Sequence, residues 1–270
     1  MLETIKETVS FIKNEANFDS EIAIILGTGL GSVVDDIQIK SEIKYVDIPN
    51  FPVSTAPGHQ GKLIFGILGG KKVMALQGRF HFYEGHTMEK LTFPIRVMKY
   101  LGIKYLFISN ASGGMNPDFE IGDLMIIDDH INLLPNPLIG KHYDELGDRF
   151  PDMSEAYDKS LILKAEKIAK SENIKVQKGC YVGVTGPTLE TPKEYVYFRI
   201  IGGDAVGMST VPEVIVAHQM GIPCFAISII TDLGVPGKIV EVSVEDVQKA
   251  ASKAAPKMVQ IMEKLIETLE

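Results

Sequence analysis

The sequence predicts an α/β fold in which helices cover both faces of a central, largely parallel β-sheet. Short apolar runs recur along the chain, and most are rich in β-branched or aromatic residues and end near Gly, Ser, Thr or Asp, as buried strands do. Helical patterns lie between several of these runs. Such an alternation is typical of parallel strands joined by crossover helices.

The expected elements follow from these patterns in chain order. The apolar runs predict strands at 22–26, 73–76, 105–108, 124–127, 181–184 and 225–230. Amphipathic periodicity predicts helices over the N-terminal segment and at 90–101, 160–171, 211–220 and from 244 to the C-terminus. Residues 135–153 contain three prolines and two glycines, so we expect a long irregular connection, which is usually functional. No linker or repeat interrupts the chain, and we expect one domain over residues 1–270.

Composition argues against several classes of protein. The net charge of −8 disfavours nucleic acid as the main partner, because a phosphate backbone is bound by a basic face, although a local pocket can still bind a small anion. No stretch approaches the roughly 18 apolar residues that span a membrane. The N-terminal segment is an acid-containing amphipathic helix rather than a signal peptide, so we expect a cytoplasmic protein.

The cysteines and histidines of the chain do not form a motif typical of a metal site or a disulfide. Cys180 and Cys224 both lie in apolar strand-like runs, so we expect buried thiols rather than a disulfide or a metal pair. The six histidines show no metal-ligand spacing such as His-Glu-x-x-His, and we expect no metal.

Residues 186–213 are the most informative part of the chain. They contain Gly-Pro-Thr-Leu-Glu-Thr-Pro, which carries Glu190, and Gly-Gly-Asp-Ala-Val-Gly-Met-Ser-Thr-Val-Pro-Glu, which carries Met208 and Ser209. Gly and Pro mark sharp turns or close approach to a ligand, and loop residues with hydrogen-bonding groups often form sites. Taken alone, the two segments fit ordinary surface turns equally well.

Two other segments suit an anion. The glycine-rich residues 27–32 follow an expected strand, and their backbone N–H groups and the Thr28 hydroxyl could cradle a phosphate. The glycine spacing does not match a dinucleotide fingerprint, and the P-loop lysine is missing. In residues 77–86, Arg79 and His81 alternate with phenylalanines, so extended backbone would point both toward one side. An edge strand with a solvated polar face is the alternative.

The remaining candidate segments follow two more expected strands. Residues 109–114 read Ser-Asn-Ala-Ser-Gly-Gly, and such small side chains let a ligand approach the backbone. Asp232 closes an apolar run, where an isolated carboxylate is costly unless it serves a ligand. Open α/β sheets bind ligands at the carboxyl ends of their strands, so we expect these segments to share one site.

Taken together, these segments resemble the trimeric purine nucleoside phosphorylases and the related 5′-methylthioadenosine phosphorylases. The likeness covers roughly residues 20–265 and is most specific at 77–85, 110–114, 186–191 and 207–213. It implies a three-layer α/β/α fold with a mixed central sheet, and a homotrimer. It also implies reversible phosphorolysis, in which a purine nucleoside and orthophosphate give the free base and ribose 1-phosphate (or the deoxy sugar) without a cofactor.

The resemblance also implies a role for each matching residue. Orthophosphate would be bound by Thr28, Arg79, His81, Asn110, Ala111 (through its backbone N–H) and Ser209. His59 and Glu84 would organise this phosphate site. The ribose would be held by Tyr83, Met208, Val244 and Phe150, the last from a neighbouring subunit. The purine would be bound by Glu190, Asp232, Tyr181, Leu189 and Val206. Catalysis would depend most on His59, His81, Glu84 and Asp232.

Two positions depart from the 6-oxopurine enzymes of this family, which carry Asn where Asp232 stands and, in the mammalian type, His where Val244 stands. An ionised Asp can only accept hydrogen bonds, which suits a 6-amino group, and Val244 suits an apolar 5′-thiomethyl group. Glu190 instead suits the ring N–H of inosine and guanosine. Because neighbouring carboxylates raise each other's proton affinity, we expect a protonated Asp232 and 6-oxopurine nucleosides, with xanthosine a further candidate. Adenosine or methylthioadenosine is the alternative.

Proteins of other classes would show different features. A nucleoside hydrolase would not need the Arg79 and His81 anion pocket. An NAD-dependent oxidoreductase would need a complete glycine fingerprint with an acidic residue about 20 positions on. A non-catalytic nucleoside-binding protein could lack the phosphate-binding residues or Asp232, which this chain keeps.

Overall fold

A computed structural model describes residues 1–28, 30–55 and 60–270 of the chain. Its strands are β1 (Ile22–Leu26), β2 (Gln38–Lys44), β3 (Lys62–Leu68), β4 (Lys71–Gln77), β5 (Tyr105–Gly114), β6 (Leu124–Asn132), β7 (Val176–Gly183), β8 (Ala205–Gly207) and β9 (Cys224–Leu233). Its α-helices are α1 (Leu2–Ala16), α2 (Met88–Leu101), α3 (Lys159–Ser171), α4 (Pro192–Ile200), α5 (Val211–Gln219) and α6 (Val244–Glu267). Short 3₁₀ turns are η1 (Gly31–Asp36), η2 (Tyr45–Asp47), η3 (Phe82–Glu84) and η4 (Asp144–Leu146).

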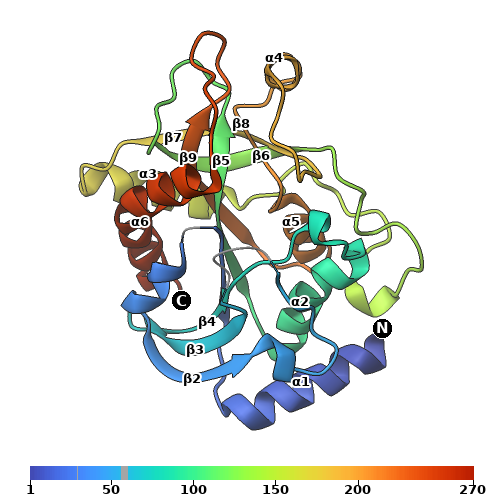
Figure 1. The fold of residues 1–270 in the computed structure, drawn as a ribbon. Helices are drawn as coiled ribbons and strands as arrows, with labels where there is room; N and C mark the ends of the chain where they lie inside the picture. Colours follow the sequence, from blue (N-terminus) through green and yellow to red (C-terminus); the bar gives the residue numbers. More distant parts are fainter. Residues whose placement is uncertain (29, 56–59) are drawn as a thin grey trace.

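The strands of this part of the chain form one mixed sheet in the order β2-β3-β4-β1-β5-β8-β7-β6-β9 (Figure 1). β1 runs parallel to β4 and β5, and β5 runs parallel to β9. The carboxyl ends of these four strands therefore lie along one edge. β9 pairs with both β5 and β6, so the second half of the sheet closes on itself.

Helices cover both faces of the sheet. In Figure 1, α6 and α3 lie together on one side of the sheet, and α1, α2 and α5 lie on the other. All five residues of β1 are buried. Because helices cover both faces of the sheet, the strand has no solvated side, and this explains its uniformly apolar sequence. In α6, the apolar stripe packs inward from Ala251 to Leu265, whereas Val244 at its start remains exposed.

The predicted elements are present, with bounds that differ in ways that matter for the site. β5 continues to Gly114 and β9 to Leu233, so residues 109–114 and Asp232 lie within long strands rather than after them. The sequence patterns missed β2, β3, β8 and α4. The antiparallel hairpin of β3 and β4 turns through Gly69 and Gly70, both with positive φ, which is a recognisable hairpin signal.

Cys180 and Cys224 are both free thiols in this structure. Cys224 is buried as expected, whereas Cys180 on β7 is only half-buried and lies near the carboxylates of Asp129 and Asp204. Burial raises the pKa of Cys180 to about 12, so this thiol is unreactive at neutral pH. Within the described ranges, no helix is long and apolar enough to cross a membrane.

Candidate active site

One cavity of about 340 Å³ is lined by side chains from the expected anion-binding segments 27–32 and 77–86, from 109–114 and 186–213, and by Asp232. It lies where the connections after β1, β4 and β7 meet β5, β8, β9 and the start of α6. Parallel pairing of β4, β1, β5 and β9 explains why segments so far apart in sequence converge there. The expected residues that line it are Thr28, Arg79, His81, Tyr83, Asn110, Ala111, Leu189, Glu190, Val206, Met208, Ser209, Asp232 and Val244.

Of the expected residues that the structure describes, three do not line this cavity. Tyr181 of β7 is fully buried, with its hydroxyl 3.5 Å from the Ser209 hydroxyl, so it contacts a residue of the cavity wall rather than the cavity itself. Glu84 lies behind His81 and contacts it from outside the cavity. Phe150 is 88% exposed on the irregular connection between β6 and α3. His59 lies outside the described residues.

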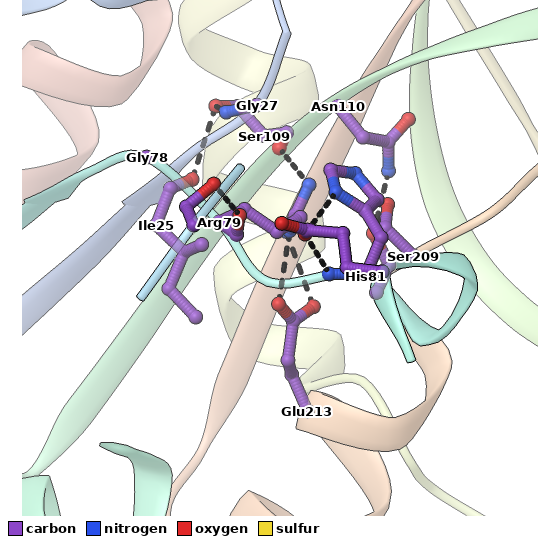
Figure 2. A network of polar contacts seen from close by, with 12 residues as sticks. Ile25, Gly27, Gly78, Arg79, His81, Ser109, Asn110, Ser209 and Glu213 are labelled. Atoms are coloured by element: carbon purple, nitrogen blue, oxygen red, sulfur yellow. Dashed lines mark hydrogen bonds and ion pairs between the residues drawn. The ribbon is translucent and has the colours of Figure 1, made fainter. Parts of the chain in front are cut away.

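Arg79 is buried at one end of the cavity and forms an ion pair with Glu213 of α5 (Figure 2). The Arg79 Nε and Nη2 atoms lie 2.9 and 3.2 Å from the two Glu213 carboxylate oxygens. Its Nη1 donates to the Ser109 carbonyl at 2.8 Å. Arg79 was expected to bind an anion, and the structure places two of its donors, Nε and Nη2, on the Glu213 carboxylate. The ion pair fixes the guanidinium rigidly beside the cavity.

Gly27 makes this close packing of Arg79 feasible. A Cβ atom at position 27 would lie 2.7 Å from the Ser109 carbonyl oxygen and 3.3 Å from Arg79 Nη1. Only glycine therefore fits between the start of the turn after β1 and the guanidinium. The glycine-rich turn thus has a packing role in addition to presenting Thr28 to the cavity.

A chain of hydrogen bonds ends at Ser209. Ser228 donates to the Asn110 side-chain oxygen at 2.5 Å, and the Asn110 amide donates to the Thr210 hydroxyl at 2.9 Å. The Thr210 hydroxyl lies 3.2 Å from the Ser209 hydroxyl. Either hydroxyl of this pair can be the donor, and the Tyr181 hydroxyl lies 3.5 Å from the Ser209 hydroxyl as well. Ser209 is thus held at the cavity wall with a hydroxyl that can donate to a ligand or accept from it. Such an arrangement suits an acceptor-rich ligand such as phosphate.

Thr210 holds this chain in place through an unusual backbone conformation. Its φ of 70° and ψ of −54°, with a hydrogen bond of 2.7 Å from Val211 N to the Ser209 carbonyl, form a tight, strained γ-turn at the start of α5. A β-branched residue with positive φ is rare and tends to occur where function requires it. The turn places Ser209 directly ahead of the α5 N-terminus, which favours a nearby anion.

His81 is oriented by Glu84, one turn further along the chain. Glu84 accepts hydrogen bonds from the His81 backbone N–H at 2.7 Å and lies 3.3 Å from the His81 Nδ1 atom. It also accepts from the Thr55 backbone and hydroxyl. Although burial alone would raise it, these hydrogen bonds lower the pKa of Glu84 to about 2. Tyr83 stacks on the His81 ring at 4.8 Å and faces the cavity from the same connection.

The opposite end of the cavity is acidic. Burial is the main cause that raises the pKa of both Glu190 and Asp232, and the charge of Asp232 raises that of Glu190 further. The sequence analysis attributed this effect to mutual repulsion alone, whereas desolvation contributes more. The Tyr195 hydroxyl of α4 donates to Asp232 at 3.3 Å. Both carboxyl groups therefore bind protons more readily than free Asp and Glu do.

Apolar side chains form the rest of this wall. Leu189 and Val244 are more than half exposed at the rim, while Val206 is buried and Met208 is half-buried. Gly186 lets the Met208 side chain lie against its backbone, since a Cβ there would meet the Met208 sulfur at 2.2 Å. A flat or apolar ligand part can therefore lie between the acidic end and the donor-rich end.

A larger cavity of about 420 Å³ lies between the start of α2 and residues 135–149, but none of the expected site residues line it. In the part of the chain that the structure describes, no three His, Cys, Asp or Glu side chains cluster as metal ligands would. The smaller cavity is therefore the candidate site, since polar groups with defined partners converge there.

Glu213, Thr210, Ser228 and Tyr195 were missed by the sequence analysis as site residues. Glu213 and Thr210 stand in the segment 202–213 that was singled out, but nothing in their spacing indicates that they contact Arg79 and Asn110. Ser228 and Tyr195 lie behind the residues that face the cavity. The only feature of the sequence that could have indicated these four residues is that each is a polar residue in or beside an apolar segment.

The chain is an α/β protein, with a mixed sheet between two helical layers. Its polar cavity lies at the carboxyl ends of the parallel strands, where α/β enzymes bind their substrates. The family model described as phosphorylase superfamily matches residues 21–267. Purine nucleoside phosphorylase 1 of Bacillus subtilis is 55% identical over 233 residues, which are 86% of each chain. The chain therefore belongs to the purine nucleoside phosphorylases of the phosphorylase superfamily.

Solved structures agree with this assignment. Schistosoma mansoni purine nucleoside phosphorylase in complex with adenosine matches with a TM-score of 0.95 and 41% identity, covering 100% of this chain and 98% of that chain. Schistosoma mansoni purine nucleoside phosphorylase in complex with inosine matches with a TM-score of 0.93 and 40% identity, covering 100% of this chain and 97% of that chain. The mixed three-layer fold that the resemblance implied is thus confirmed.

Proposed function

We propose that this chain catalyses the reversible phosphorolysis of purine nucleosides, which yields the free base and ribose 1-phosphate. The observation that carries the proposal is that Arg79 and Glu190 line the same 340 Å³ cavity. The hydrogen-bond donors lie at one end of this cavity and the carboxyl groups at the other. A nucleoside between them would have its sugar near the phosphate and its purine near the acids.

The charges that develop in the reaction match the two ends. Cleavage of the glycosidic bond builds positive charge on the sugar and negative charge on the departing purine. A phosphate held by Ser209 and His81 would stabilise the first, and a proton donor at the purine would stabilise the second. Holding phosphate and nucleoside together also removes much of the entropic cost of a bimolecular reaction. Arg79 would contribute through its positive field and by fixing Ser109, while Glu213 keeps it in place.

The acidic end favours inosine and guanosine. Glu190 can accept from the ring N–H that these bases carry, and a protonated Asp232 can donate to the 6-oxo oxygen. Burial of Asp232 supports its protonation, because desolvation raises its pKa. Adenosine is the second candidate, since the schistosome relative is described in complex with adenosine as well as with inosine. Exposed Val244 at the rim also leaves methylthioadenosine as a substrate to be assayed.

Phe150 supports a further part of the proposal, namely a homotrimer in which each subunit completes its neighbour's site. Its ring is almost fully exposed and lies on the irregular connection at 135–153, where Ile139 is also exposed. Exposed apolar side chains on one loop are typical of an interaction surface. A neighbouring subunit's Phe150 would then cover the sugar side of the cavity.

The test is a side-by-side assay of inosine, guanosine, adenosine and methylthioadenosine with and without orthophosphate. We expect inosine and guanosine to be cleaved only when phosphate is present, with ribose 1-phosphate as product. Cleavage to free ribose without phosphate would instead indicate a hydrolase. Absence of any cleavage, with binding of nucleoside retained, would indicate a binding protein and contradict the proposal.

A further inference from the structure

Ser228 is a polar residue in the middle of the apolar strand β9. It is completely buried, and it is not among the described residues that line the candidate cavity. In the parallel pairing of β5 and β9 it lies directly opposite Asn110. Asn110 and Ser112 are two residues apart on β5, so their side chains point to the same face of the sheet. Ser228 can therefore contact two residues of the cavity wall from behind.

The Ser228 hydroxyl forms hydrogen bonds with both of these residues. It donates to the Asn110 side-chain oxygen at 2.5 Å and lies 2.6 Å from the Ser112 hydroxyl. The Asn110 amide nitrogen donates in turn to the Thr210 hydroxyl at 2.9 Å. The oxygen and the nitrogen of the Asn110 side chain thus form a bridge between β9 and the residue that precedes α5.

This bridge ends at a strained part of the backbone. Thr210 is β-branched and has a φ of 70°, a combination that persists only where the surrounding structure holds it. The hydrogen bond from Asn110 fixes the Thr210 side chain, and Ser209 lies 3.2 Å from it, hydroxyl to hydroxyl. Ser209 lines the cavity, so a change in the Thr210 turn would move a residue of the phosphate end.

The stability of the strands does not by itself account for these polar groups. Asn110, Ser112, Thr210 and Ser228 are each at most 4% exposed. Replacing both partners of a buried hydrogen bond by apolar groups of the same shape is often neutral or stabilising. A buried network that could be replaced in this way, and that leads to a residue of the site, therefore indicates a role in positioning that residue.

Resting on the proposed function, we propose that Ser228 is a positioning residue for the phosphate end of the cavity. Ser228 holds the Asn110 side chain, and Asn110 holds the Thr210 turn. The turn in turn places the Ser209 hydroxyl where orthophosphate would bind. Ser228 acts on phosphate binding without touching the ligand.

Calorimetric titration with inorganic phosphate, in the absence of nucleoside, tests this role. We expect Ser228→Ala to weaken phosphate binding by about fivefold, because it leaves the Asn110 oxygen without its buried partner. Ser20→Ala is the matched control. Ser20 is 7% exposed and its hydroxyl also has two hydrogen-bond contacts, with the carbonyls of Ile22 and Lys72, but it lies outside the cavity wall. The control should lose stability and keep its phosphate affinity.

A double-variant cycle separates positioning from a general loss of packing. If Ser228 and Thr210 act on Ser209 through the same bridge, Ser228→Ala combined with Thr210→Ala should weaken phosphate binding little more than the stronger single variant. Independent effects would multiply to about 25-fold and would overturn the inference.

A second variant covers the case in which Ser228→Ala does not fold. Ser228→Cys keeps a weak S–H donor at this position and should weaken phosphate binding by a smaller factor, about twofold. Unchanged phosphate affinity in whichever of the two variants folds would overturn the inference.

The two proposals fail in different ways. If the unmodified protein binds phosphate but does not cleave inosine, the proposed function is wrong, and the titrations still decide the role of Ser228. If it cleaves inosine and the folded Ser228→Ala protein binds phosphate equally well, only the Ser228 inference is wrong. Absence of phosphate binding by the unmodified protein would contradict both.

Discussion

Arg79 and Glu213 form a two-bond ion pair, at 2.9 and 3.2 Å, between side chains that are 1% and 6% exposed. They are 134 residues apart in the sequence. The pair ties the connection after β4 to the first turn of α5, and so holds together two walls of the donor-rich end.

Replacing Glu213 by Ala should destabilise the fold strongly. The Arg79 charge would remain buried without its carboxylate partner, which costs about 3–5 kcal/mol in comparable pairs. Urea unfolding measures this loss. Glu21→Ala, which breaks an exposed pair with Lys104, is the control and should cost less than about 1 kcal/mol. If both variants lost the same free energy of unfolding, burial would not make the Arg79–Glu213 ion pair more important for stability than an exposed pair.

Thr210→Ala should impair phosphate use more than Thr210→Ser. Ala removes the hydroxyl that accepts from Asn110 and hydrogen-bonds the Ser209 hydroxyl, whereas Ser keeps it. Loss of a buried hydrogen-bonding partner leaves the Asn110 amide unpaired, and we expect at least an about fivefold rise in the KM for phosphate. Steady-state kinetics at varied phosphate measure the effect. An equal loss in both variants would assign it to the methyl group instead.

Glu84→Gln should change how stability depends on pH. The folded-state pKa of Glu84, about 2, lies below its ordinary value of 4.5, so its ionised form stabilises the fold above pH 4.5, and this contribution is lost as the pH falls toward 2. The Gln variant should therefore be less stable than the unmodified protein at neutral pH, with a difference that shrinks in acid. Urea midpoints across the pH range test this. A difference independent of pH would mean that the Glu84 charge does not contribute.

Asp232→Asn should keep or improve inosine turnover and stabilise the fold at neutral pH. Asn supplies the donor that the protonated Asp supplies in our proposal. The raised folded-state pKa of Asp232 means that its contribution to stability is full below its ordinary value of 3.8 and is lost as the pH rises through the raised value. Asn removes that loss, so the gain in thermal midpoint should appear at pH about 7 and vanish in acid. Loss of inosine turnover in a stable variant would contradict the protonated-Asp proposal.

Phe150→Ala should raise the KM for the nucleoside and leave the stability of each subunit nearly unchanged. The side chain is almost fully exposed, so its removal leaves no cavity within its own subunit. If it covers a neighbour's sugar site, the KM for phosphate should stay the same. Mixing this variant with a Ser209→Ala protein, and assaying the mixed oligomers, tests whether the contribution crosses subunits. Unchanged nucleoside kinetics would remove Phe150 from the site.

The sequence by itself determined the elements whose patterns are local and strong. β1, β5 and β9 are continuous apolar runs because both faces of the sheet are covered, and α6 shows a long stripe because one face packs inward. The candidate segments were found for a similar reason. Polar residues and glycines that follow a buried strand are unusual, and the topology of parallel sheets places them at one edge.

Three of the four missed elements have weak local patterns. β2 is mostly exposed at the edge of the sheet, so it carries no apolar run, and α4 buries only Tyr195 and Phe198. β8 has three residues, too few to show any period. Their existence depends on the neighbours that pair with them or cover them.

Only the tertiary structure decided the contacts that define the chemistry of the site. The partners of Arg79, Asn110 and Asp232 are Glu213, Thr210 and Tyr195, between 37 and 134 residues away. The residues next to a charged or polar residue in the sequence do not indicate which distant group will form its ion pair or hydrogen bond. Hydrogen bonds and ion pairs depend on distances of a few tenths of an ångström, and such distances arise only when separate elements pack together.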